Sequence, residues 1–227
     1  MKQIALDRFG IDEIISLYKD KPVIKVLQGI RRSGKSFMLE FLSRKIVENS
    51  ATENQILLLN MEDFENVELL DSKKLYDFIK SKSEAADGKK LYLFLDEIQE
   101  VSGWEKLVNS LYSSATIDAD IYITGSNANL LSSELATYLS GRYVLIHVWP
   151  LSYREFLYFN SENDSAAAFR KFIEFGGFPG LKDMMENPVQ IRSYLEGIYS
   201  TVLLKDVIAR NRIRDTAVLE KIILYIA

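Results

Sequence analysis

Two patterns of hydrophobic and polar residues alternate over the first 150 positions of the chain. Short, mostly apolar runs rich in β-branched residues predict strands at 23–28, 55–60, 90–95, 120–124 and 143–148. Between these runs apolar residues recur with helical spacing, which predicts helices at 9–18, 37–47, 75–79, 104–115 and 130–139. Runs that are apolar throughout are typical of strands buried on both faces, so we predict an α/β fold with a parallel sheet.

The pattern changes after Pro150, because no strand pattern recurs beyond it. Ser152 and Glu155 form a capping box that predicts the start of a helix. Further helices are expected at 166–175, at 187–209 and from 216 onward. We therefore expect one domain of residues 1–150 and a helical region of residues 151–227. Because the chain stops inside an apolar helix, we also expect a longer protein to continue beyond it.

Composition narrows the class of protein. The chain has 227 residues, of which 48% are hydrophobic, and a net charge of -4, as expected of a globular protein. No stretch approaches the roughly 20 apolar residues of a membrane span, so we expect a cytoplasmic protein with no membrane part. There is no cysteine, and the one histidine, His147, is expected to be packed within its strand. Disulfides and a histidine-based metal site are therefore not expected.

One loop matches the phosphate-binding consensus G-x-x-x-x-G-K-[ST], known as the Walker A motif. It follows the strand at 23–28, precedes the helix at 37–47 and reads Gly29-Ile30-Arg31-Arg32-Ser33-Gly34-Lys35-Ser36. Strand, loop and helix in this order are the setting that the motif requires. The alternative is an ordinary glycine-containing turn between a strand and a helix.

Each residue type in this loop suits a polyphosphate. Gly29 and Gly34 let the backbone approach without a Cβ in the way, and the N–H groups that begin the next helix point at the anion. Lys35 would contact the β- and γ-phosphates, and Ser36 would bind Mg²⁺. We therefore expect the nucleotide to be bound by Gly29, Ile30, Arg31, Arg32, Ser33, Gly34, Lys35, Ser36 and Phe37.

The strand at 90–95 ends in two adjacent carboxylates, Asp96 and Glu97. About sixty residues after a phosphate-binding loop, this is the Walker B pattern. Asp96 would help to hold Mg²⁺ through water, and Glu97 would orient and polarise the attacking water as a general base. The alternative is a carboxylate pair that merely begins a loop. A Glu directly after the Asp is also typical of the class of ATPases in which an added strand lies between the Walker A strand and the Walker B strand.

Two further positions are candidates for sensing or stabilising the γ-phosphate. The strand at 120–124 runs into small polar residues, of which Asn127 is the first choice for a sensor side chain, Ser126 the second, and Thr124 the third if the strand ends early. A turn closed by these residues is the alternative. Arg142 could act as an arginine finger in its own subunit or in a neighbour. Otherwise it is a surface arginine at a helix end.

Read together, these segments resemble the AAA-type ATPases of bacteria and archaea, and within them a family in which an N-terminal ATPase precedes a C-terminal domain, often nuclease-like. The resemblance spans nearly the whole chain. Besides the phosphate-binding loop, it is carried by Leu95-Asp96-Glu97-Ile98-Gln99, Thr124-Gly125-Ser126-Asn127, Leu139-Ser140-Gly141-Arg142, Pro150-Leu151-Ser152-Tyr153-Arg154-Glu155-Phe156, Gly176-Gly177-Phe178-Pro179 and Leu204-Lys205-Asp206.

The resemblance implies a P-loop NTPase core with a five-stranded parallel sheet in the order 5-1-4-3-2. A helical lid and a winged-helix-like region would follow. It also implies that the turn ending in Pro179 packs near the nucleotide base, so Pro179 is expected to contact the cofactor ATP. The larger C-terminal domain of the family, where partners would be recognised, is absent from this sequence.

The leading hypothesis is Mg²⁺-dependent hydrolysis of ATP to ADP and phosphate, with ATP favoured because no Asn-Lys-x-Asp guanine motif is present. Catalysis would depend on Glu97, Lys35, Asn127 and Arg142, and Mg²⁺ would be held by Ser36 and Asp96. A slowly hydrolysing switch that binds ATP or ADP and signals to a protein partner is the alternative, and a homo-oligomer is possible. Arg210, Arg212 and Arg214 could contact DNA, or they could belong to a solvated turn. A small-molecule kinase is a weaker alternative.

Overall fold

The computed structural model describes residues 10–126, 139, 141–202 and 216–226. The chain divides into two compact units, Met1–Pro179 and Gly180–Ala227.

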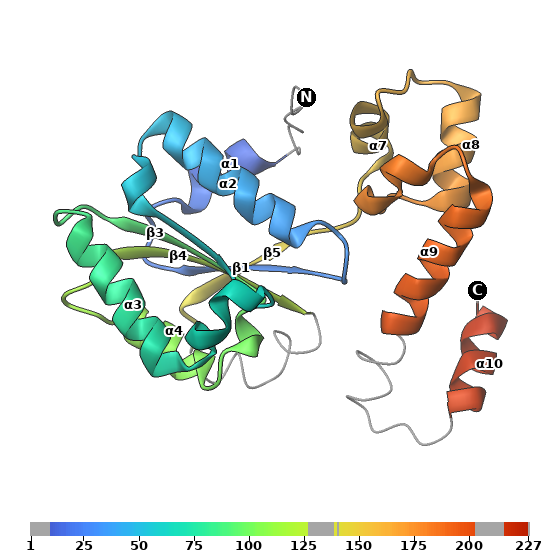
Figure 1. Cartoon of the computed structure of the whole chain (residues 1–227). Helices are drawn as coiled ribbons and strands as arrows, with labels where there is room; N and C mark the ends of the chain where they lie inside the picture. The colour runs from blue at the N-terminus through green and yellow to red at the C-terminus, as the bar shows by residue number, and fades with distance from the viewer. Residues whose placement is uncertain (1–9, 127–138, 140, 203–215, 227) are drawn as a thin grey trace. The chain divides into compact units, whose positions relative to one another are not determined.

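A five-stranded sheet forms the centre of the first unit (Figure 1). Its strands lie in the order β2-β3-β4-β1-β5, and every neighbouring pair is parallel. Read from the other edge, this is the order 5-1-4-3-2, so the predicted topology of a P-loop NTPase core is confirmed. The bounds are β1 Ile24–Gly29, β2 Ile56–Asn60, β3 Leu91–Asp96, β4 Ala119–Ser126 and β5 Tyr143–His147.

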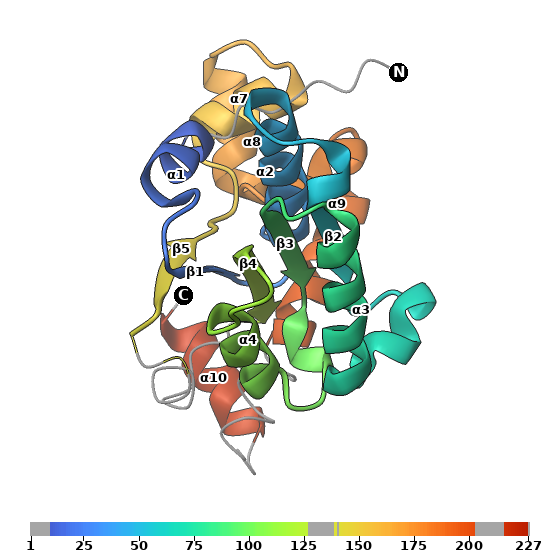
Figure 2. The same ribbon diagram turned by 90° about the vertical axis from the view of Figure 1, so that its left-hand side faces the viewer.

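Helices cover both faces of the sheet, which explains why its central strands are apolar throughout (Figures 1 and 2). All six residues of β3 are buried, whereas the edge strand β5 leaves Leu145 and His147 exposed. One core lies beneath α1 and α2 and the other beneath α3 and α4. These helices span α1 Ile11–Tyr18, α2 Lys35–Asn49, α3 Ser72–Ala85 and α4 Trp104–Tyr112.

His147 is not packed as the sequence led us to expect. Because β5 is an edge strand, its outward positions face solvent, and His147 stacks on Trp149 at a centroid distance of 5.8 Å. Three short 3₁₀ turns were also not predicted, since none has the length over which a period becomes visible. They are η1 Glu53–Gln55, η2 Phe64–Leu70 and η3 Ile98–Glu100.

The strand register brings the motif segments to one edge of the sheet. Gly29 at the end of β1 is paired with Ser126 at the end of β4, and Asp96 at the end of β3 is paired with Asn60. All strands run in the same direction, so these residues share the carboxyl edge. In open parallel sheets, ligands bind at this edge.

Helices follow the last strand, as the sequence predicts. Ser152 caps α7 (Tyr153–Asn160) in a capping box with Glu155, and Ser165 caps α8 (Ala166–Phe175). Both helices lie within the first compact unit, which ends at Pro179. Residue 150 therefore marks the end of the sheet, and its status as a domain boundary remains a prediction.

The second unit consists of helices in the part that the structure describes. Asn187 caps α9 (Pro188–Thr201), with proline at the first helical position as predicted, and α10 spans Thr216–Ile226. A short turn, η4 (Pro179–Met184), precedes α9. The predicted helix at 130–139, except Leu139, and the arginines 210, 212 and 214 lie outside the described residues. The winged-helix-like region remains a prediction. Among the described helices, none is both long and apolar enough to cross a membrane.

Candidate active site

The phosphate-binding loop leaves β1 at a point that only glycine fits. A Cβ on Gly29 would lie 2.2 Å from the carbonyl oxygen of Val148, which follows β5. The loop then passes through two left-handed residues, Arg32 with φ 64° and Gly34 with φ 98°, before α2 begins at Lys35. Gly34 at the N-cap makes no side-chain hydrogen bond to this helix, and the N–H groups at a helix N-terminus favour an anion.

Lys35 lies buried at the start of α2, with 5% of its surface exposed. Its Nζ donates to the carbonyl oxygens of Gly29 and Ile30, at 3.2 and 3.3 Å, and lies 3.9 Å from Oε1 of Glu97. A buried ammonium needs such partners. Phosphate oxygens would offer stronger acceptors at the same place, so Lys35 is ready to contact a polyphosphate.

One hydroxyl from the neighbouring strand links the Asp96 carboxylate to the backbone of Glu97. Thr124 Oγ1 donates to Oδ1 of Asp96 and accepts the backbone N–H of Glu97 at 3.0 Å. Glu97 adopts a left-handed backbone conformation with φ 51° and ψ 48°. Non-glycine residues in this region are strained and are concentrated at functional sites. The chain therefore turns sharply after β3 and keeps both carboxylates at the carboxyl edge.

Burial raises the pKa of Glu97 above the ordinary value of a glutamate, and the nearby charges of Asp96 and Glu62 contribute to the increase. A hydrogen bond from Gln99 and the positive charge of Lys35 oppose it. A raised pKa makes the carboxylate a better proton acceptor, which suits a general base near neutral pH.

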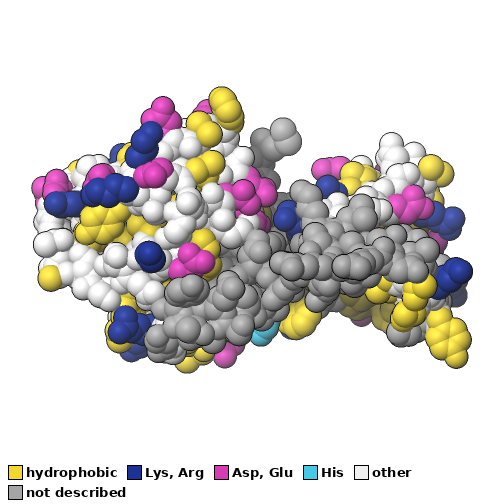
Figure 3. All heavy atoms as spheres, turned by 90° about the horizontal axis from the view of Figure 1, so that it is seen from below, with side chains coloured by type: hydrophobic (Ala, Val, Ile, Leu, Met, Phe, Trp, Pro, Cys, Tyr) yellow, Lys and Arg dark blue, Asp and Glu magenta, His cyan; other side chains and the backbone are white. Residues whose placement is uncertain are grey.

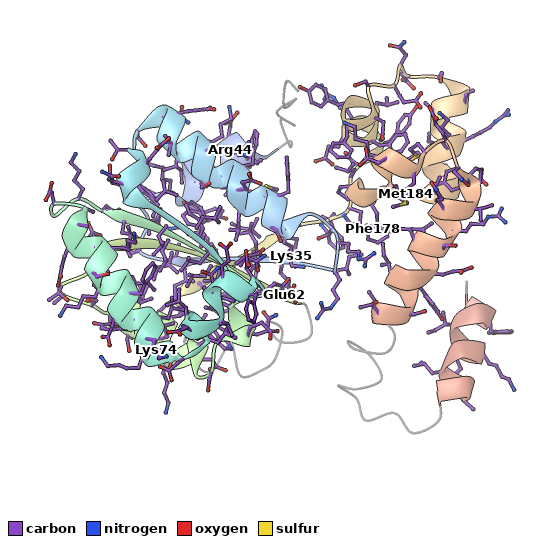
Figure 4. All side chains as sticks on the ribbon, in the orientation of Figure 1. Lys35, Arg44, Glu62, Lys74, Phe178 and Met184 are labelled. Atoms are coloured by element: carbon purple, nitrogen blue, oxygen red, sulfur yellow. The ribbon has the colours of Figure 1, made fainter. Side chains whose placement is uncertain are left out.

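Two side chains at this site were missed as functional candidates. Gln99 donates from Nε2 to Oε2 of Glu97 at 2.6 Å, although the sequence marked it only as part of a motif. Glu62, just after β2, approaches Arg31 of the phosphate-binding loop at 4.0 Å. Figure 4 shows Glu62 and Lys35 at the same edge of the sheet. Arg31 and Glu62 are far apart in the sequence, so their proximity could not be predicted from it. They approach each other because β1 and β2 run in the same direction and end at the same edge of the sheet.

The structure describes two of the three sensor candidates, Thr124 and Ser126. Thr124 is fully buried and its hydroxyl is engaged with Asp96 and Glu97. Ser126 ends β4 beside Gly29. Asn127, the first choice, lies outside the described residues, so its role remains a prediction.

Arg142 is not brought to the phosphate-binding loop within this chain. It directly precedes β5, and its carbonyl oxygen accepts the N–H of Ile24 at 2.8 Å, so it lies at the amino edge of the sheet. At about 3.3 Å per strand residue, the length of β1 puts roughly 16 Å between this edge and Gly29. The guanidinium lies 5.5 Å from the ring centroid of Tyr112. A role as an arginine finger would require a neighbouring copy and remains a prediction.

The turn that ends in Pro179 is linked to the segment after β5. Leu151 donates its N–H to the carbonyl oxygen of Gly177 at 2.7 Å, and a Cβ on Gly177 would lie 2.0 Å from the carbonyl oxygen of Leu151. Val148, three residues earlier, contacts Gly29. The turn is thus connected to the phosphate-binding loop through a short segment, and contact of Pro179 with a nucleotide base remains a prediction.

The residues present fit Mg²⁺ bound together with a nucleotide. Among the described residues, no group of three or more His, Cys, Asp or Glu side chains could hold a metal alone. Mg²⁺ commonly takes one or two protein ligands and completes its shell with phosphate oxygens and water. Ser36 in the first turn of α2 and Asp96 at the end of β3 supply such a hydroxyl and carboxylate.

Comparison with known proteins gives a family and two relatives of unknown role. A family model described as "AAA domain" matches residues 21–157. An uncharacterized protein of Haemophilus influenzae is 39% identical over 231 residues, which cover 100% of this chain and 56% of that protein. An uncharacterized protein of Methanocaldococcus jannaschii is 33% identical over 208 residues, which cover 85% of this chain and 43% of that protein. The chain thus spans about half the length of these curated relatives.

Among solved structures, the chain is similar to AMPPCP-bound DnaA from Aquifex aeolicus. The TM-score is 0.49 at 16% identity, and the match covers 89% of this chain and 62% of that one.

Proposed function

This chain belongs to the AAA domain family, and on that premise we propose that it binds ATP and hydrolyses it to ADP and phosphate with Mg²⁺. The observation that carries the proposal is the placement of Lys35 and Glu97. An ammonium suited to phosphates and a carboxylate with a raised pKa lie 3.9 Å apart at the end of the phosphate-binding loop. This is the arrangement needed to hold a γ-phosphate beside a base.

The residues divide the work as follows. The loop N–H groups and Lys35 would hold the phosphates, and Ser36 and Asp96 would hold the metal. Bound Mg²⁺ would supply positive charge that offsets the negative charge developing on the phosphate oxygens. Glu97 accepts a proton from water as the water oxygen attacks the γ-phosphorus. The bond from that phosphorus to the bridging oxygen breaks, and its electrons leave with ADP.

Calorimetry on the wild type and Lys35→Ala, each with Mg²⁺-ATP and Mg²⁺-ADP, tests the binding step. We expect the wild type to bind and Lys35→Ala to lose most of its affinity, because the variant lacks the buried ammonium that would contact the phosphates. Lys80→Ala, an exposed lysine on α3, is the matched control and should bind normally. Equal binding by both variants would remove Lys35 from the site.

Glu97→Gln tests the chemical step. It should bind Mg²⁺-ATP yet hydrolyse it about 10²- to 10⁴-fold more slowly, the usual contribution of a general base. Phosphate release is the measurement, and Glu174→Gln, exposed on α8, is the control. Undiminished hydrolysis by Glu97→Gln would contradict its assignment.

A slow switch remains the second candidate, favoured by the close backbone contact between Leu151 and Gly177. If the turn after α8 follows the nucleotide, this contact would transmit its state to the lid or to a partner protein. Rapid turnover by the isolated chain would argue against a switch. Exchange of ADP for ATP that alters protease cleavage after α8 would support it.

The DNA-binding alternative has little support from the described surface. Lys73 and Lys74 on α3 are paired with Asp77 at 2.7 Å and Glu68 at 3.6 Å. Basic and acidic side chains are interspersed over the described part of the face in Figure 3. The candidates for a DNA contact, Arg210, Arg212 and Arg214, are tested by salt, because binding through phosphates should weaken as the salt concentration rises.

A further inference from the structure

We propose that Gln99 is a positioning residue, which holds Glu97 by one carboxylate oxygen and leaves the other turned toward the phosphate-binding loop. The proposal rests on the proposed function, because the role it assigns belongs to the hydrolytic step. Gln99 contacts Glu97, the proposed general base, and would not itself contact the phosphates.

The two oxygens of Glu97 face different groups. Oε2 accepts from Nε2 of Gln99 at 2.6 Å, whereas Oε1 lies 3.9 Å from Nζ of Lys35. An ionised carboxylate only accepts hydrogen bonds, so the amide must present its N–H₂ group to it. The oxygen on the Lys35 side is therefore the one that can meet a water beside the γ-phosphate.

The backbone fixes Gln99 in this place. Glu97 turns the chain through its left-handed conformation, and the 3₁₀ turn η3 follows at once. Ile98 anchors the turn in the core with no exposed surface, and Val101 donates its N–H to the Ile98 carbonyl oxygen at 3.0 Å. Gln99 thus approaches Glu97 from a braced turn and not from a free loop.

Bound phosphates make this contact more important. They would compete with Glu97 for Lys35, since phosphate oxygens are the stronger acceptors for an ammonium. Gln99 is then the one side chain in the described part of the molecule that still donates a hydrogen bond to the Glu97 carboxylate. Without it, the carboxylate could rotate, and small misplacements of a reacting group slow catalysis strongly.

The other end of the amide fits a functional role better than a structural one. Oε1 of Gln99 is buried and accepts no hydrogen bond from any residue that the structure describes. A buried acceptor without a donor opposes folding. Its amide therefore gains little stability for the fold, while its N–H₂ group serves Glu97.

Gln99→Met tests the proposal, because methionine has a similar length and no donor. We expect kcat to fall about 10- to 100-fold, with Mg²⁺-ATP affinity by calorimetry and the midpoint of thermal unfolding close to wild type. The matched control is Gln190→Met at an exposed position of α9, which should leave all three unchanged. Unchanged kcat in Gln99→Met would overturn the positioning role. A fall in kcat that merely accompanies a lower midpoint of thermal unfolding would overturn it as well.

A double-mutant cycle separates a role through Glu97 from a general one. In single-turnover experiments, Glu97→Gln combined with Gln99→Met should be no slower than Glu97→Gln alone, because the residue being positioned is gone. Additive losses would show that Gln99 acts elsewhere and would overturn the proposal.

A third measurement does not depend on hydrolysis. The side-chain amide resonance of Gln99 in ¹⁵N–¹H spectra, assigned by its loss in Gln99→Met, should shift in Glu97→Gln and stay in place in Glu174→Gln. An unmoved resonance overturns the contact itself. If the resonance moves but the wild type never hydrolyses Mg²⁺-ATP, the proposed function fails and the positioning role fails with it, while the contact stands.

Discussion

Each edge of the central sheet holds a buried lysine beside a carboxylate, and the two pairs are built differently. At the amino edge, Lys25 has no exposed surface and is bonded to Asp120 and to the carbonyl oxygen of Lys21. At the carboxyl edge, Lys35 lies 3.9 Å from Glu97 and donates to two loop carbonyl oxygens. One ammonium is locked to its carboxylate, and the other is only near it.

The groups around the amino-edge pair complete its hydrogen bonds. Asp120 also accepts from the Tyr122 hydroxyl at 3.1 Å and from the backbone N–H of Asp20 at 3.0 Å. Burial lowers the pKa of Lys25, and Asp120 opposes that decrease. Burial also raises the pKa of Tyr122, so its hydroxyl remains a donor. The carboxyl edge has instead a strained Glu97 and a long ion pair. A pair in close contact stabilises the fold, whereas a loose pair can exchange partners.

Lys25→Met should have the largest effect on stability. It leaves Asp120 buried without its counter-charge, which typically costs about 3–5 kcal/mol, measured as the free energy of unfolding in urea. Lys35→Met is the matched substitution at the other edge and should change stability little. Replacing both members, Lys25→Met with Asp120→Leu, should recover much of the loss. Equal destabilisation by the two single variants would end the distinction between the edges.

Thr124→Val should have an intermediate effect, which we expect to be clearest in catalysis. It removes the hydroxyl that bridges Asp96 and Glu97 and keeps the shape of the side chain, so turnover should fall on the order of tenfold. Thr124→Ser retains the hydroxyl and should retain most activity in the same phosphate-release assay. A Val variant as active as the Ser variant would show that this bridge does not position Asp96 and Glu97 for catalysis.

Asp20→Asn should have the smallest effect, because this carboxylate at the amino edge is 39% exposed. Burial favours a higher pKa for Asp20, but hydrogen bonds from Lys19 and Lys90 outweigh it and hold the pKa below that of an ordinary aspartate. The wild type should therefore be more stable than Asp20→Asn at neutral pH, by less than about 1 kcal/mol.

The pH dependence of that difference has a fixed sign. Because the folded-state pKa is depressed, the contribution is present above the ordinary pKa of about 3.9 and is lost as the pH falls through the lower folded value. Urea unfolding of both proteins from pH 7 down to pH 3 should show the two curves converging in acid. A gap that widened in acid would contradict the role of Lys19 and Lys90.

The strands and both motifs could be predicted from local signals in the sequence, whereas the order of the strands was implied by the family resemblance. Apolar runs mark buried strands, and Gly29, Lys35, Asp96 and Glu97 lie at fixed spacings that the chemistry of phosphate and metal demands. Caps at Ser152 and Asn187 were equally local, because each side chain bonds the backbone two or three residues away.

Contacts between distant segments could not be predicted in this way. The register of β3 and β4 decides that Thr124 meets Asp96, and no pattern in either strand states that register. The sequence predicts that Arg142 follows the end of a helix, but only the parallel direction of β5 places it at the amino edge. Gln99 reaches Glu97 because of a left-handed turn at a non-glycine residue, which residue preferences disfavour.

That turn has a consequence for engineering the protein. A left-handed conformation costs an ordinary residue about 1–2 kcal/mol, and glycine or asparagine adopts it more easily. Glu97→Gly or Glu97→Asn would therefore relax the backbone while removing the base. A search for heat-resistant variants would collect such inactive substitutions at this position, so stability and activity must be selected together here.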